Sequence, residues 1–131
     1  MTQGLDALAQ SCHQNAVDHG FYDSDIAIRI SLPPALEEGH TQNEALKRIC
    51  LIGTELSEMA EAVRSPRRAD HIRKNPVIVT SDEFTLEEEE AADVLIRLLD
   101  YCVFRQIRLE EAVQAKMAFN KTREYKHGKL S

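Results

Sequence analysis

The chain has 131 residues, of which 43% are apolar and 29% charged, a balance that excludes a largely disordered protein and fits a single domain over residues 1–131. The formal net charge of −6 disfavours binding to a nucleic-acid polymer, because that affinity comes mainly from Lys and Arg neutralising phosphates. With no membrane-length apolar stretch, no signal-peptide pattern and no CxxC pair, we expect a cytoplasmic protein that contacts no membrane.

The scarcity of Gly and Pro, with long periodic apolar runs, predicts an all-α protein. The first helix is expected over about residues 2–19, with Gly20 as its stop. Residues 21–40 are ambiguous, because every second residue is apolar, as in a strand, before a Pro-Pro pair. The alternating residues are Ile26, Ile28, Ile30 and Leu32. This segment is either a short strand or an extended loop over the core.

The second helix has an apparent start signal, since Thr41 and Glu44 have the spacing of a capping box. Apolar residues then follow helical spacing at positions 46, 49, 52, 56, 59 and 63, and Ser65-Pro66 ends the helix. The next segment is basic and then strand-like over residues 77–79. A small β pairing with residues 26–32 would be compatible with this pattern.

The third helix begins with a second capping box, formed by Thr85 and Glu88. From residue 91 to residue 104 it is apolar almost all the way round, which predicts a central, buried element. A turn near residues 106–108 leads into a fourth helix over about residues 109–124. The sequence thus predicts a four-helix bundle with at most a minor β pairing.

Two pairs of acids interrupt the apolar stripes of the second and third helices. Glu55 and Glu58 are three residues apart, as are Glu90 and Asp93, so each pair lies on one side of a helix. Two carboxylates about 5 Å apart repel by roughly 3 kcal/mol at an effective dielectric constant of about 20. Four converging carboxylates therefore need protons or a cation, and all-oxygen ligation favours Mg²⁺, with Mn²⁺ as the alternative.

Other interpretations of these acids exist. Glutamates at helical spacing usually form a solvated face, and for Glu55 and Glu58 alone this interpretation is equally good. Asp93 fits a buried site better, because nearly all its neighbours are apolar. A di-iron bundle would need Glu-x-x-His on two helices, and no His stands three residues after a Glu. Arg97 could pair with Asp93 or Asp100, or face a substrate.

The fourth helix carries a polar group of its own. Lys116, Asn120 and Arg123 are spaced i, i+4 and i+7, so they extend one side of the helix beyond its apolar stripe. They suit the mouth of a pocket for phosphates. The alternative is an ordinary helix end with solvated charges. The amphipathic helices also predict self-association, as a homodimer or a dimer of dimers, because one chain offers few helices to cover the third.

With these motifs in place, the chain resembles the MazG-like family of all-α nucleoside triphosphate pyrophosphohydrolases. The resemblance spans about residues 46–129 and is carried by ELSEMAEAVR, EEAADVLIRLLDYC and KMAFNKTREYKHGK. It implies that the four acids bind Mg²⁺ and that Lys116 and Asn120 reach the phosphates. The 31 residues between the two acidic pairs are more than is usual for the family (90 − 58 − 1). The resemblance does not indicate the base.

The expected reaction is hydrolysis of a nucleoside triphosphate to the monophosphate and pyrophosphate. Water attacks the α-phosphorus, Glu55 or Glu58 acts as the base, and Lys116 with Arg123 holds the leaving charge. Two other classes remain open: a module that binds metal and nucleotide, or a partner protein, without catalysis, and a purely structural helical oligomer.

Overall fold

The computed structural model describes residues 4–64 and 84–123, which form five α-helices and one 3-10 helix and contain no strand. The elements are α1 (Leu5–Asp18), α2 (Asp23–Ser31), η1 (Pro34–Leu36), α3 (Glu37–Arg64), α4 (Leu86–Phe104) and α5 (Leu109–Lys121). The all-α prediction is confirmed for this part of the chain. None of its helices is both long and apolar enough to cross a membrane.

Helix α1 ends where the sequence predicts. Gly20 adopts a left-handed conformation with φ of 82°, which a residue with a side chain rarely tolerates. The amide of Gly20 donates to the carbonyl of Val17, and the amide of Phe21 donates to the carbonyl of Ala16. These two bonds form a Schellman motif, which satisfies the last carbonyls of α1 and turns the chain towards α2.

The interpretation of residues 21–40 as a short strand or an extended loop is wrong, because most of this segment belongs to α2, η1 and the start of α3. Asp23 and Asp25 in the first turn favour a helix by their interaction with the helix dipole. Arg29, one turn later, donates from Nε to both carboxylate oxygens of Asp25 at 3.0 Å. The alternating isoleucines are exposed in this short helix, Ile30 to 82%. Residues 77–79, the other half of the suggested β pairing, lie outside the described residues.

The capping box predicted at Thr41 is also wrong, since α3 begins at Glu37, directly after η1. The hydroxyl of Thr41 donates to the carbonyl of Glu37 one turn earlier, as it does inside a helix. The Glu44 side chain contacts Arg48 and Lys47 rather than a helix start. Helix α3 is therefore an uninterrupted 28-residue helix.

The second capping box is confirmed. The hydroxyl oxygen of Thr85 accepts from the amide of Glu88 at 3.2 Å, and the Glu88 carboxylate accepts from the amide of Thr85 at 2.6 Å. The two bonds satisfy donors that the first turn of α4 would otherwise leave unpaired. This fixed start determines which side of α4 carries Glu90 and Asp93.

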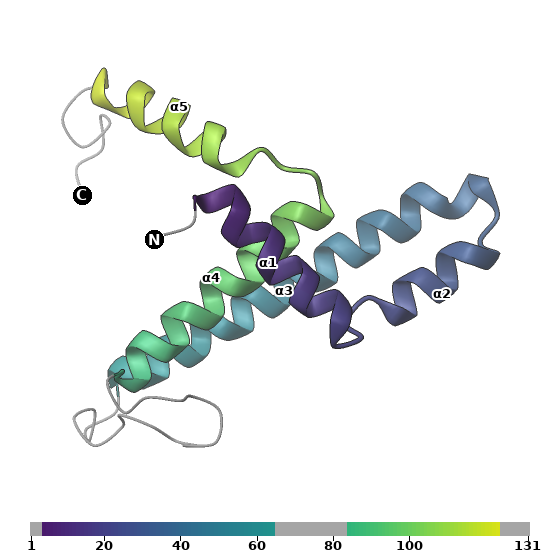
Figure 1. The fold of residues 1–131 in the computed structure, drawn as a ribbon, viewed down its shortest axis with the longest axis horizontal. Coiled ribbons are helices and arrows are strands. Elements are labelled where there is room, and N and C mark those ends of the chain that lie inside the picture. The colour runs from purple at the N-terminus through teal and green to yellow at the C-terminus, as the bar shows by residue number, and fades with distance from the viewer. Residues whose placement is uncertain (1–3, 65–83, 124–131) are drawn as a thin grey trace.

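Helices α3 and α4 pack as an antiparallel pair, and α1 packs against α4 (Figure 1). The side chain of Tyr22, only 4% exposed, links the α1–α2 corner to this pair. Its hydroxyl donates to Oδ1 of Asp100 at 2.8 Å, and the Arg48 guanidinium lies 3.7 Å from its ring centroid. His13 also contacts Oδ1 of Asp100 at 2.8 Å. This polar and aromatic cluster joins α1, α3 and α4.

The sequence predicts that α4 is enclosed by the other helices, but the described helices leave part of it exposed. Leu86, Leu99 and Cys102 are buried, but Leu95 and Ile96 on the same helix are 42% and 46% exposed. Helix α5 packs mainly on α1 and leads away from the α3–α4 pair (Figure 1). Other exposed apolar side chains on α3 and α5 are Leu46, Ile49, Leu56, Val63, Val113, Met117 and Phe119. A closed four-helix bundle is therefore not confirmed.

Candidate metal centre

The antiparallel packing of α3 and α4 brings the predicted acids together. Glu55 and Glu58 lie in the second half of α3, and Glu90 and Asp93 lie in the first half of α4. One carboxylate oxygen from each of Glu55, Glu58 and Glu90 lies within 4.8 Å of the other two. The i, i+3 spacing, read from the sequence, thus produces a cluster contributed by both helices.

Asp93 belongs electrostatically to the same cluster. The pKa of its carboxyl is raised, first because partial burial beside α3 disfavours its charge, and then because the negative charges of Glu55 and Glu58 repel it. The positive charge of Arg97 opposes this shift only in part. The residue as a whole remains accessible to solvent, so the sequence-based expectation of a deeply buried Asp93 is wrong.

The position of Arg97 differs from the expected alternatives. Its Nε donates to Oε1 of Glu55 at 2.7 Å across the α3–α4 interface, rather than to Asp93 or Asp100. The Glu55 side chain is 12% exposed and that of Arg97 38% exposed. Arg97 thus holds Glu55 in place, whereas the Glu58 residue is exposed. The sequence could not identify this pair, because it depends on the register between two helices.

The cluster fits a hard divalent cation. Its donors are all carboxylate oxygens, which Mg²⁺ and Mn²⁺ prefer. Octahedral Mg²⁺ with bonds of about 2.1 Å separates its ligand atoms by about 3 to 4 Å, so the oxygens within 4.8 Å of one another need only small side-chain rotations. The pKa of Asp93 is raised first by its partial burial and then by the negative charges of Glu55 and Glu58, both of which a bound cation would offset.

The structure does not place the predicted phosphate-binding residues beside these acids. The charged groups of Lys116 and Arg123 instead lie 5.3 Å and 5.6 Å from the centroid of the Phe119 ring. Oδ1 of Asn120 is buried and has no hydrogen-bond partner within the described parts of the chain. Helix α5 follows the end of α4, whereas Glu90 and Asp93 lie near its beginning (Figure 1).

A second group of ionisable side chains, which we did not predict from the sequence, is formed by Asp25, His40 and Glu44. Asp25 and His40 lie in the segment interpreted as a strand or loop, and Glu44 was interpreted as part of a helix cap. The two-residue alternation hid the helical spacing that brings them together. The sequence does contain i, i+4 spacings that indicate the cluster, namely His40 with Glu44, Asp25 with Arg29 and Glu44 with Arg48.

Comparisons of the chain with protein-family models, with curated proteins and with solved structures find no match to any of them.

Proposed function

We propose that the chain is a metal-dependent nucleoside triphosphate pyrophosphohydrolase of the MazG-like type. The substrate is a nucleoside triphosphate, and the products are the monophosphate and pyrophosphate. The observation that carries the proposal is the convergence of Glu55, Glu58, Glu90 and Asp93 from two antiparallel helices, where Arg97 bonds to Glu55. An excess of carboxylates with all-oxygen donors favours Mg²⁺ and the polyphosphates that Mg²⁺ accompanies.

The four acids differ in their surroundings, and these differences suit them to different roles. When bound, Mg²⁺ supplies positive charge against the triphosphate oxygens. Glu55, fixed by Arg97, is suited to hold the ion in a defined position. Glu58 is exposed and can accept a proton from the water that attacks the α-phosphorus. Glu58 is therefore a better candidate for the base than Glu55, although both remain candidates.

The phosphate-binding role of α5 depends on assembly. Lys116, Asn120 and Arg123 form a donor-rich surface, but in one chain this surface is separate from the acids. Exposed apolar side chains on α3, α4 and α5 leave room for a second copy to complete a bundle. A homodimer, or a dimer of dimers, would cover Leu95 and Ile96 and can bring α5 to the triphosphate.

The test is pyrophosphate release from a panel of ribo- and deoxynucleoside triphosphates, with Mg²⁺, with Mn²⁺ and with chelator. We expect metal-dependent pyrophosphate together with the matching monophosphate, and sedimentation should give a mass of at least two chains. Release of inorganic phosphate instead would place the attack at the γ-phosphorus and contradict the proposal.

The separation of α5 from the acids in one chain favours a second candidate, a module that binds a metal–nucleotide complex without turnover. It predicts Mg²⁺-dependent nucleotide binding with no products for any member of the panel. If the chain neither binds nor hydrolyses any nucleotide of the panel, the purely structural helical oligomer is favoured. That alternative predicts no effect of Mg²⁺ on the melting temperature.

A further inference from the structure

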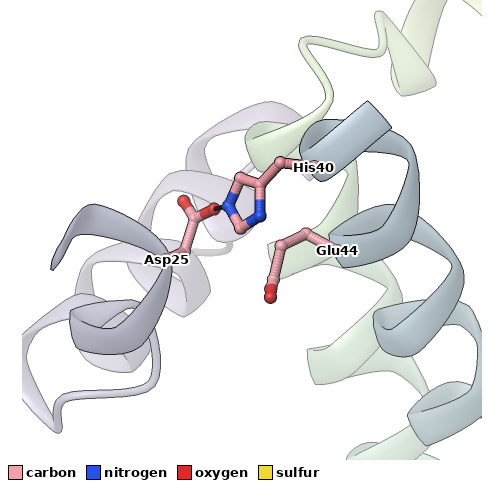
Figure 2. Close-up of side chains that lie close together, drawn as sticks. All are labelled: Asp25, His40 and Glu44. Atoms are coloured by element: carbon pink, nitrogen blue, oxygen red, sulfur yellow. Dashed lines mark hydrogen bonds and ion pairs between the residues drawn. The ribbon is translucent and has the colours of Figure 1, made fainter. Parts of the chain in front are cut away.

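Asp25, His40 and Glu44 form a compact cluster between α2 and the first turns of α3. Nε2 of His40 lies 2.7 Å from Oδ1 of Asp25, and one ligand atom from each of the three side chains lies within 4.8 Å of the other two. Figure 2 shows His40 reaching from α3 towards Asp25, with Glu44 one turn later on the same side of α3. Asp25 is 5% exposed, Glu44 8%, and the His40 side chain 12%.

Glu44 is weakly bonded for so buried a carboxylate. Its contacts with Lys47 and Arg48 are both 3.4 Å long, whereas charge-assisted hydrogen bonds are typically about 2.7 to 2.9 Å. Arg48 has two other partners, the carbonyl of Phe21 at 3.2 Å and the ring of Tyr22 at 3.7 Å. Lys47 is 56% exposed and can be solvated. Both contacts are long enough for the Glu44 carboxylate to rotate towards a ligand, while Arg48 keeps its bond to the Phe21 carbonyl and its contact with the Tyr22 ring.

Asp25 is oriented as a metal-ligating carboxylate often is. Arg29 donates to both its oxygens, and such outer hydrogen bonds commonly hold ligating carboxylates in place. Oδ1 also faces Nε2 of His40. Tetrahedral zinc with bonds of about 2.0 Å separates its ligand atoms by about 3.3 Å. The 2.7 Å contact would open slightly and Glu44 would approach, both by side-chain rotation.

We propose that Asp25, His40 and Glu44 bind a divalent d-block cation of the zinc class, through one imidazole nitrogen and two carboxylates. The imidazole is the group that distinguishes this site from the four acids, because nitrogen ligands favour zinc, nickel and copper over Mg²⁺. Asp25 is the one buried residue of α2. The ion therefore fastens α2 to α3 where apolar packing contributes little.

The experiment is calorimetric titration of the full chain with Zn²⁺ in excess Mg²⁺, which occupies the four acids. We expect one zinc site whose affinity falls at least tenfold in His40→Ala and in Glu44→Gln. Titration with Co²⁺ should give the visible absorption of a four-coordinate ion, and this absorption should be lost in the same variants. Circular dichroism checks that each variant is folded. If His40→Ala does not fold, the zinc affinity of Glu44→Gln, which preserves side-chain size, tests the proposal.

Three controls separate this site from other zinc ligands. His19→Ala removes an exposed histidine at the end of α1 and should leave zinc binding unchanged. Glu58→Gln tests the four acids, and Cys50→Ser tests the exposed thiol. Zinc binding that survives Glu44→Gln, or that is lost in Cys50→Ser or Glu58→Gln instead, overturns the proposal. None of these results depends on turnover of a nucleotide.

Discussion

Asp25 and Glu44, between α2 and the start of α3, each contact a cation of the same chain, whereas at Asp93, on α4 beside α3, burial and acidic neighbours outweigh the nearby cation. Arg29 pairs with Asp25, and Arg48 with Lys47 contacts Glu44. Of the four acids further along, Glu55 pairs with Arg97, and the pKa of Asp93 is raised because burial and its acidic neighbours outweigh that arginine. A carboxylate whose pKa is raised by burial and acidic neighbours is stabilised by a proton or by an external cation, whereas one held by a cation of the chain needs neither.

The same difference separates the two metal sites that we propose. In our proposal the four acids would bind a hard ion through carboxylate oxygens alone, which most divalent cations can accept as ligands. The cluster around His40 has little excess charge, so its selectivity must come from the imidazole nitrogen. Removing one carboxylate from each site should therefore have opposite consequences for stability in the absence of metal.

The largest effect is expected for Glu58→Gln. Loss of a general base typically lowers turnover by about 10² to 10⁴-fold, and this loss should appear in Mg²⁺-dependent pyrophosphate release. The matched control is Glu61→Gln, one turn along α3, where Glu61 is exposed and pairs with exposed Arg64. Full activity of Glu58→Gln would remove Glu58 from the chemistry.

The next effect is on stability, at the compensated end of α3. Asp25→Asn should lower the free energy of unfolding by about 3 kcal/mol, because it leaves Arg29 and His40 without their buried partner. Urea denaturation in chelator measures this change. Asp18→Asn, at an exposed position of α1, should change the stability by less than about 0.5 kcal/mol. Equal stability of the Asp25 variant and the native chain would show that these ion pairs contribute nothing.

Asp93→Asn should change the free energy of unfolding in the opposite direction to Asp25→Asn, and by a smaller amount. In chelator it removes repulsion and should raise the free energy of unfolding by about 0.5 kcal/mol, a value reduced because the residue is accessible to solvent. In Mg²⁺ the native chain should gain melting temperature and the variant should gain less. If Asp93→Asn is destabilising in chelator, the carboxylates do not repel one another as we infer.

The smallest effect is the pH dependence of these two differences. Folded Asp93 holds its proton to higher pH than its ordinary pKa of 3.8, so the native chain loses stability as pH rises through that raised pKa. The gain from Asp93→Asn should thus vanish below about pH 3.8. Burial raises the pKa of Asp25, but the hydrogen bonds to Arg29 and His40 lower this pKa by more than burial raises it. The net shift is therefore downward. Its contribution is present above 3.8 and is lost as pH falls through the lowered pKa.

Urea denaturation of both variants and the native chain from about pH 3 to pH 7 tests this pair of signs. On acidification, the gain in the free energy of unfolding caused by Asp93→Asn and the loss caused by Asp25→Asn should both become smaller. A gain from Asp93→Asn that persists unchanged at the lowest pH would show that charge repulsion is not its cause.

Local signals predicted those parts of the fold that depend on local interactions. The capping box at Thr85 and the stop at Gly20 are complete within one turn of chain, and both are confirmed. The box at Thr41 was wrong because residues before it, beginning with Pro34, already form helical turns. The interpretation of residues 21–40 as a strand or a loop was wrong because Asp25 pairs with Arg29 and His40 at helical positions, and the alternation of apolar residues does not reveal such pairs.

The candidate site was predictable where helical spacing alone determines it. The i, i+3 spacing places two acids on one side of each helix, and the antiparallel packing of α3 and α4 brings the two pairs together. The contact between Arg97 and Glu55 and the position of α5 depend on register and crossing angle, which the sequence does not display. The exposure of Leu95 and Ile96 arises because the described helices do not close around α4.

The continuity of α3 sets a geometric constraint on both clusters. Glu44 and Glu55 are eleven residues apart (55 − 44), which is about three full turns and about 16 Å along the axis. The two carboxylates therefore point to nearly the same side of one rod. A single residue inserted between them would rotate one cluster by about 100° against the other, whereas four inserted residues would nearly restore the phase. Evolution can lengthen this helix only in whole turns if both ends are to keep their partners.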